Sequence, residues 1–424
     1  MANNQWRGDA PAVAQVVTLL VDGTPATGQV YGVTINGKSI AYTAILGDTN
    51  ASIAASLTSL LELSTTPAEF QEVIWSNDGS AVVTATAATA GVPFELTTSA
   101  TGTGLLTPTT VTPSTGPNHA DDPANWSLGT VPTAGDDVLI DGGSDLLYGL
   151  GNLTAAAFAS LSITAGFTGA IGLPVRHGVG VGTALGNGYV EYRVRMFPVG
   201  SAVPIPIGAG TDTGTGSGPT LVNLACTTTL ALTVLATGTP QSTAAPVVNV
   251  SGCAAGELSM ISGSVGLAAD LASLVATVGT ILVAGGTLSI GSGASVTTLT
   301  QNSGIINLAG TVSTLNMTGG TFNLSGSLGT VTATPAPSGR VRLLWRGGGT
   351  ISSLTFQGQG AGQTAPVLDC SYDPRAKVLT SASFTGGAKL FDPSKTVTMT
   401  NPIAMDRASL ATSDLGAVFF IQRT

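Results

Sequence analysis

The fold is decided by one repetitive stretch, residues 286–334, which reads GTLSIGSGASVTTLTQNSGIINLAGTVSTLNMTGGTFNLSGSLGTVTAT. Its apolar residues form two alternating units. The first unit recurs with a spacing of 18 and then 16, as Leu288 and Ile290, Ile306 and Leu308, and Phe322 and Leu324. The second recurs twice with a spacing of 16, as Val296 and Leu299, Val312 and Leu315, and Leu328 and Val331. A fixed period of this length is typical of solenoid proteins.

The composition of the repeat favours strands over helices. Thr, Val and Ile fit a pleated surface, and good helix formers are almost absent. One such unit cannot bury its own apolar face, so neighbouring units must stack. We therefore predict a mainly β protein whose repeat forms a right-handed parallel β-helix. An ordinary β-sandwich of meandering strands is the alternative.

The composition of the whole chain indicates a turn-rich all-β protein with few surface charges. Charged residues make up 9% of the 424 residues, compared with roughly 25% in an average soluble domain. Such a surface, solvated by hydroxyls and amides, is typical of extracellular and virion structural proteins. The net charge is −9 and the sequence has no basic run, so we expect no nucleic-acid partner.

Two targeting features are absent from the sequence pattern. No apolar stretch long enough to span a bilayer runs without Gly, Ser or Thr, so we expect no transmembrane helix and no membrane partner. Residues 1–15 lack the charged and apolar regions of a signal peptide.

The N-terminal part divides into three segments. Residues 1–14 are a polar arm that could dock on a neighbouring subunit. Residues 15–104 predict a small α+β module, and residues 105–120 form a Thr/Pro/Gly linker.

Local signals support the α+β assignment of the module. Asn36 and Gly37, between two alternating runs, predict a hairpin. Asp48 or Thr49 can cap a helix whose apolar face is formed by Ile53, Leu57, Leu60 and Leu61.

Residues 121–424 are predicted to form the β-helix, with an irregular insertion near 174–220. Within that insertion, Glu191, Arg193 and Arg195 alternate with apolar residues, which predicts a two-faced strand. A solenoid needs a cap over its terminal rung, and Trp126 is the candidate for this role.

Two parts of the chain resemble bacteriophage proteins. Segments Thr34–Thr43, Gly47–Leu61 and Val82–Thr98 resemble an assembly module of phage structural proteins. Asn125–Gly143 resembles the entry segment of bacterial and phage β-helix proteins. The resemblance implies a virion structural protein whose module mediates assembly and carries no catalytic residue. Release by lysis, as for virus particles, would explain an extracellular type of composition without a signal peptide.

This resemblance also implies a location and partners. It favours a capsid decoration or head-fibre protein on the exterior of the particle. The implied partners are further copies in a homotrimer and other virion proteins, such as the major capsid protein. A tail fibre or tail spike is the alternative within this class. A carbohydrate-binding adhesin or a polysaccharide-active β-helix enzyme is the alternative outside it.

The ionisable residues do not predict an active site. The best candidates, Asp369, Asp373, Arg375 and Lys377, are so close in sequence that a turn would splay them apart. His119 and His177 have no clear Ser or Asp companion in the sequence. We therefore predict neither catalytic residues nor a cofactor.

Metal sites are also not expected. The aspartates near the entry segment could assemble a Ca²⁺ site, but their spacing is not that of an EF-hand loop, and solvated turns explain them better: Asp121, Asp122, Asp136, Asp137 and Asp141. The cysteines lack metal-site spacing and predict buried free thiols, with Cys226 and Cys253 in neighbouring rungs: Cys226, Cys253 and Cys370.

One charged cluster is a candidate surface contact. Arg340, Arg342 and Arg346 surround Trp345. A charged outer strand with a core tryptophan is one interpretation. The other is a contact with a subunit or a host-surface glycan, in which Trp345 stacks on the partner.

Overall fold

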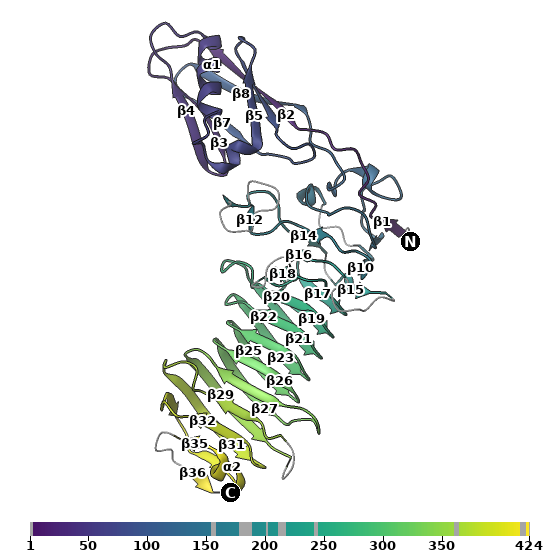
Figure 1. Cartoon of the computed structure of the whole chain (residues 1–424), viewed down its shortest axis with the longest axis vertical. Coiled ribbons are helices and arrows are strands. Elements are labelled where there is room, and N and C mark those ends of the chain that lie inside the picture. The colour runs from purple at the N-terminus through teal and green to yellow at the C-terminus, as the bar shows by residue number, and fades with distance from the viewer. Residues whose placement is uncertain are drawn as a thin grey trace.

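The computed structural model describes residues 3–153, 158–177, 189–200, 202–210, 218–240, 245–359, 364–415 and 421–423. The molecule is elongated. The N-terminal module lies at one end, and a long stack of strands leads from it to the C-terminus (Figure 1).

The module combines two antiparallel sheets with one helix. The strands of the four-stranded sheet are, in order, β5 (Val73–Asn77), β6 (Val82–Ala87), β2 (Val16–Gly23) and β8 (Gly104–Thr112). Those of the three-stranded sheet are β4 (Lys38–Thr43), β3 (Val30–Ile35) and β7 (Thr97–Ala100). The helices are α1 (Asn50–Leu61) and the short 3₁₀-helix η1 (Ala68–Glu72).

The local signals in the module are confirmed. Asn36 and Gly37 have φ angles of 51° and 71° and form the turn between β3 and β4. Thr49 caps α1, and its hydroxyl accepts a hydrogen bond from the Ser52 amide. Ile53 and Leu57 are buried as expected, whereas Leu60 is only partly buried.

The linker predicted at residues 105–120 begins later than expected. Residues 105–112 instead belong to β8, which pairs with β2 along its whole length. Pro108 is tolerated because β8 is an edge strand of the four-stranded sheet.

Two long parallel sheets, which we call the stack, form most of the remaining described part of the molecule. The 15-stranded sheet contains, in order, β1 (Asn3–Gln5), β9 (Asp137–Ile140), β10 (Ser160–Thr164), β15 (Pro204–Ala209), β17 (Thr229–Val234), β19 (Ala255–Met260), β21 (Ala276–Val283), β23 (Ala294–Gln301), β25 (Thr311–Met317), β27 (Ser327–Ala333), β29 (Gly349–Gln357), β31 (Lys377–Thr385), β34 (Ile403–Met405) and β36 (Ile421–Arg423), with β33 (Val397–Met399) also beside β31.

The 12-stranded sheet contains β11 (Ala170–Ile171), β16 (Leu221–Cys226), β18 (Val248–Ser251), β20 (Ser264–Leu267), β22 (Thr287–Ile290), β24 (Ile305–Leu308), β26 (Gly320–Leu324), β28 (Val341–Trp345), β30 (Val367–Asp369), β32 (Lys389–Asp392) and β35 (Asp414–Leu415), with β14 (Phe197–Val199) also beside β16. From β15 to β32, successive strands alternate between the two sheets. The stack is therefore consistent with a parallel β-helix, and its parallel pairing contradicts a meandering sandwich.

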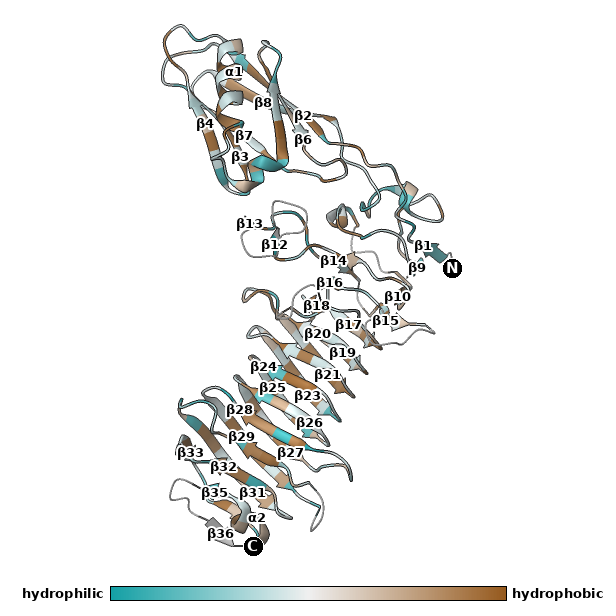
Figure 2. Cartoon of the chain, in the orientation of Figure 1, coloured by the Kyte–Doolittle hydropathy of each residue, from teal (hydrophilic) through white to brown (hydrophobic). Residues whose placement is uncertain are grey.

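The strand register confirms the repeat. Val296 pairs with Val312, and Val312 with Leu328. In the other sheet Leu288, Ile306 and Phe322 are aligned in the same way. These side chains point into the core and are at most 2% exposed, and hydrophobic residues alternate with polar ones along the strands (Figure 2).

The length of one coil varies outside the repeat. One buried column runs through Leu232, Leu258, Ile281, Leu299, Leu315, Val331, Leu354 and Ala382, and its spacing is shortest from Leu299 to Val331. In the coil from Val331 to Leu354, most of the extra residues lie between β27 and β28. Where coils are shortest, glycines stack: a Cβ on Gly326 would lie 2.0 Å from the carbonyl oxygen of Gly310.

The N-terminal arm and the insertion also differ from expectation. Asn3–Gln5 of the arm form the first strand of the 15-stranded sheet in this same chain. The insertion contains an antiparallel pair, β12 (Arg176–His177) and β13 (Tyr189–Val190), outside the two sheets. The stack resumes at Phe197, earlier than predicted.

The other short helices connect these elements. They are η2 (Pro123–Asn125), η3 (Leu150–Asn152) and α2 (Arg407–Thr412). Within the described residues, no helix is long and apolar enough to cross a membrane.

Candidate functional site

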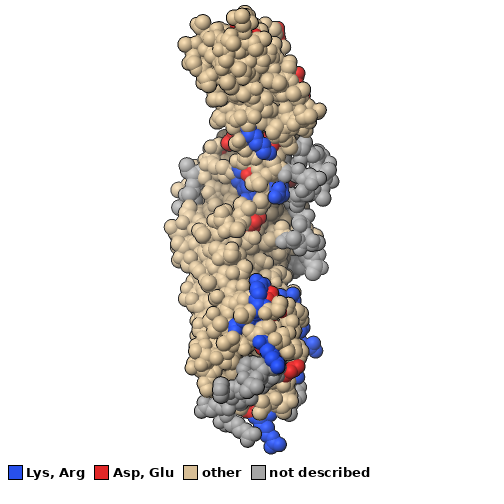
Figure 3. Space-filling model, turned by 90° about the vertical axis from the view of Figure 1, so that its left-hand side faces the viewer, with Lys and Arg blue, Asp and Glu red and all other residues tan. Residues whose placement is uncertain are grey.

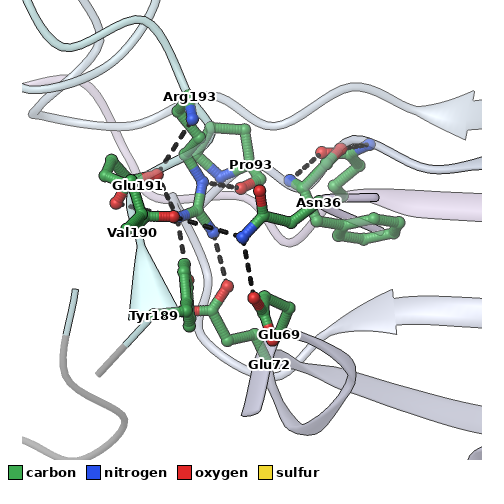
Figure 4. A network of polar contacts seen from close by, with 10 residues as sticks. Asn36, Glu69, Glu72, Pro93, Tyr189, Val190, Glu191 and Arg193 are labelled. Atoms are coloured by element: carbon green, nitrogen blue, oxygen red, sulfur yellow. Dashed lines mark hydrogen bonds and ion pairs between the residues drawn. The ribbon is translucent and has the colours of Figure 1, made fainter. Parts of the chain in front are cut away.

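The first candidate site is the junction where the insertion contacts the module. Arg193, between β13 and β14, is buried there (Figure 4). Its Nη2 lies 2.7 Å from Glu72 Oε2 of the module, and its Nη1 lies 3.1 Å from Glu191 Oε1. Its Nε donates to the carbonyl oxygen of Pro93 at 2.6 Å. One guanidinium therefore joins two segments of the module to the stack.

Further polar contacts extend this junction. Asn36, at the hairpin turn, donates from Nδ2 to Glu69 Oε1 at 2.7 Å and to the carbonyl oxygen of Val190 at 3.2 Å. The Tyr189 hydroxyl donates to Glu72. The β3–β4 hairpin, whose turn is formed by Asn36 and Gly37, thus also contacts the insertion.

The electrostatics of the junction favour a fixed charge state. Burial alone opposes the charge of Arg193, but Tyr192, Glu72 and Glu191 around it raise its pKa above the usual value. Burial, and then the contact with Glu72, raises the pKa of Tyr189. Arg193 therefore stays charged and Tyr189 stays protonated at neutral pH. We call this junction the clamp.

This clamp differs from the two-faced strand predicted around Glu191, Arg193 and Arg195. Glu191 and Arg193 are both 6% exposed, because the module covers them. Arg195 forms an ion pair with Asp270. The partner Glu72 lies in a different domain and far away in the sequence, so periodicity alone could not reveal it.

Beside the clamp, His119 has companions that the sequence did not reveal. Its Nε2 lies 3.3 Å from Ser114 Oγ, and its Nδ1 lies 3.5 Å from Asp121 Oδ1. The three residues line a cavity of about 270 Å³ between module and stack. The hydrogen bond from His119 is the main reason that the pKa of Asp121 is lowered.

Ser114, His119 and Asp121 form what we call the Ser114–His119–Asp121 row, and its geometry does not favour nucleophilic catalysis. His119 Nε2 also lies 3.0 Å from the carbonyl oxygen of Gly91, which can only accept a hydrogen bond. The Gly91 carbonyl and the Ser114 hydroxyl thus share one ring nitrogen, so Nε2 is not reserved for taking the proton of Ser114. The row therefore ties the module to the segment that follows it. The side chain of His177 lies outside the described part.

The other catalytic candidates do not converge on a shared site. Arg375 Nη2 lies 2.7 Å from Asp373 Oδ2 on the surface, while Lys377 is buried and donates to backbone carbonyls. Asp369 accepts hydrogen bonds from Ser371.

Metal ligands and thiols give no candidate centre either. Among the described residues, no group of three His, Cys, Asp or Glu side chains could hold a metal ion. The three cysteines are buried free thiols, as predicted. Cys226 and Cys253 are neighbours: a hydrogen bond to Cys226, together with burial, raises the pKa of Cys253.

Trp126 lies at the N-terminal end of the stack core, near the first strand β1. It is 1% exposed, and its ring is 5.0 Å from that of Trp6 in a T-shaped contact. Its Nε1 donates to the carbonyl oxygen of Ala120, whereas Trp6 donates to that of Ser144. The end of the core is thus covered by two tryptophans, of which the sequence indicated one.

The predicted surface cluster needs one correction. Trp345 is completely buried, because it points inward from β28 and aligns with Leu324. It cannot stack on a partner. Arg340, Arg342 and Arg346 are exposed as expected, and the ring beside Arg346 is Tyr372, with 4.7 Å between guanidinium and ring centroid.

Comparison with known proteins assigns no family. The chain matches no model of a known protein family and no curated protein sequence. Its resemblance to phage proteins therefore rests on the sequence motifs alone.

Proposed function

We propose that this chain is a non-enzymatic structural protein of a bacteriophage particle, a head decoration or head-fibre protein on the capsid exterior. The stack, as a right-handed parallel β-helix, projects outward, and the module anchors to a virion protein such as the major capsid protein. The observation that carries the proposal is an elongated stack clamped to a separate module through buried Arg193.

An apolar end of the module supports the anchoring role. Ile45 and Leu46 are 63% and 90% exposed in the connection between β4 and α1. This connection lies at the end of the molecule away from the stack (Figure 1). Adjacent exposed large apolar side chains are typical of protein contacts.

The test adds the purified full chain to particles that lack it, followed by sedimentation and negative-stain imaging. We expect an elongated homotrimer by light scattering and decoration of the particles. Leu46→Glu should abolish decoration, whereas Val275→Glu, an exposed apolar position on the stack, should not. A monomer that never associates with particles contradicts the proposal.

The alternative function is a hydrolase acting on a polysaccharide or its esters, and Ser114, which lies beside His119, is the residue at which to test it. The full chain and the Ser114→Ala variant should be compared on a panel of such substrates. We expect no turnover by either. Turnover that Ser114→Ala removes would favour the enzyme.

A further inference from the structure

The charges of the chain are segregated along its length. Residues 1–270 contain 5 Lys and Arg against 18 Asp and Glu, and residues 271–339 contain none of either. Residues 340–424 contain 9 Lys and Arg against 5 Asp and Glu. Lys and Arg side chains gather on one face of the C-terminal half (Figure 3). The end of the stack away from the module therefore carries most of the cations.

Six residues define what we call the distal patch: Arg342, Arg346, Tyr372, Arg375, Lys389 and Phe391. Arg342 and Lys389 occupy one outward column of the 12-stranded sheet, each aligned with Val367 of the strand between them. Two strand spacings separate them by about 10 Å. Arg346 follows the opposite end of β28, about 13 Å from Arg342 along the strand.

Most of these cations have no carboxylate partner. The patch contains one ion pair in the described part of the chain, between Arg375 and Asp373. Arg342, Arg346 and Lys389 are exposed and form none there. Charges left without a partner on an otherwise acidic or uncharged molecule are available to an external anion.

Two aromatic rings are exposed among these cations. Tyr372 is 50% exposed and lies under the Arg346 guanidinium. Phe391 is 38% exposed and lies two residues from Lys389 on the same strand, and its aligned neighbours on the adjacent strands are Asp369 and Asp414. Arg375 donates to the carbonyl oxygen of Arg346 and so holds this corner together. Flat apolar faces beside cations can stack on pyranose rings while the cations pair with acidic substituents.

We propose that the distal patch binds an acidic polysaccharide. The spacing of the cations favours this occupant over a nucleic acid. A nucleic-acid strand carries one phosphate about every 3.4 Å, so cations about 10 Å apart would leave most phosphates unpaired. A polymer with sparser charges and ring faces between them matches the patch better. This inference does not depend on assembly into a particle.

The test measures retention of the purified full chain in native gels that contain hyaluronate, in which only every second sugar carries a carboxylate, with neutral dextran as the matched polymer. We expect retention by hyaluronate alone, and weaker retention when NaCl rises above about 0.15 M. Arg342→Gln combined with Lys389→Gln should weaken binding about tenfold. Tyr372→Ser should weaken it too, whereas Arg7→Gln, an exposed cation near the other end of the stack, should not.

Three results overturn the proposal. The first is no retention by hyaluronate, or equal retention of the double variant with an unchanged circular dichroism spectrum. The second is tighter binding to single-stranded DNA than to hyaluronate. The third is salt-sensitive self-association that the double variant abolishes, which assigns the patch to a second copy of this chain. Failure of decoration together with hyaluronate binding would reject only the virion role.

Discussion

At the scale of single residues, the junction between the insertion and the module depends on Arg193. Its guanidinium is a shared partner of Glu72 and Glu191, and all three side chains are at most 11% exposed. Arg193→Leu removes the cation that both carboxylates share. We expect a loss of about 3–5 kcal/mol in the free energy of unfolding, measured by denaturant titration.

A conservative variant separates charge from geometry at this position. Arg193→Lys keeps the positive charge but loses the fork that reaches Glu72, Glu191 and Pro93 together. Its stability should lie between those of the wild type and Arg193→Leu. Equal stability of all three proteins would contradict the role of the clamp.

The acid stability of the protein should depend in part on Asp121. Its pKa is lowered by the hydrogen bond from His119 and then by that from Asn152, while burial opposes them. Because the pKa of Asp121 is lower in the folded state, Asp121 adds to the free energy of unfolding at pH values above the pKa of the unfolded chain, near 4. This contribution is lost as the pH falls below that pKa. The free energy of unfolding of the wild type should exceed that of Asp121→Asn by about 1 kcal/mol at neutral pH. Denaturant titrations should show this difference shrinking below about pH 4, and a constant difference would contradict the assignment.

At the scale of elements, each strand of the stack has a core face and a solvent face. Leu315 of β25 is fully buried between Leu299 and Val331, whereas Thr314 points to the other face. Leu315→Ala should cost about 2–5 kcal/mol because the rungs above and below cannot close the cavity. Thr314→Ala should change the free energy of unfolding by no more than about 0.5 kcal/mol. Thermal and denaturant unfolding measure both losses. A register shifted by one residue would expose Leu315, and Leu315→Ala would then cost no more than Thr314→Ala.

The same elements show what the sequence could predict. The coils around β23 to β27 were predicted residue by residue, because their turns are short and the period of 16 is intact. The same column continues through Leu354 and Ala382. Its residues are farther apart in the sequence there, so the period of 16 is lost. Strand β8 was assigned to a linker because its Thr and Pro residues form a strand only through pairing with β2.

The candidate sites were less predictable than the core. Arg342 and Arg346 were identified because they stand out in an uncharged region, but their neighbour Tyr372 lies in the next coil. Ser114 and Asp121 flank His119 closely in the sequence, yet only the turn between them brings their side chains to its ring. The sequence allows two interpretations of Trp345. Its side chain points inward from β28 and is buried, so it is a core tryptophan.

At the scale of the whole molecule, the stack should tolerate the loss of one complete coil. Ser295 aligns with Thr311, and Ile305 aligns with Thr321, so the segment 295–310 is one complete coil. Deleting it joins Ala294 to Thr311 and brings β25 onto β21 and β26 onto β22, with every buried column kept in register. Because each coil contacts only its neighbours, we expect a folded protein, shorter by about 4.8 Å.

Deleting the segment 303–310 is the matched control, because removing half a coil moves strands from one sheet to the other and breaks both ladders. Small-angle scattering and circular dichroism distinguish the two deletions. The full-coil deletion should keep the strand signal and cooperative unfolding, and the half-coil deletion should lose both. If both deletions lose the strand signal and cooperative unfolding, the stack is not a sum of exchangeable coils. If both fold, the repeat period does not set the register, and the columns through Leu299, Leu315 and Val331 are not what holds the stack together.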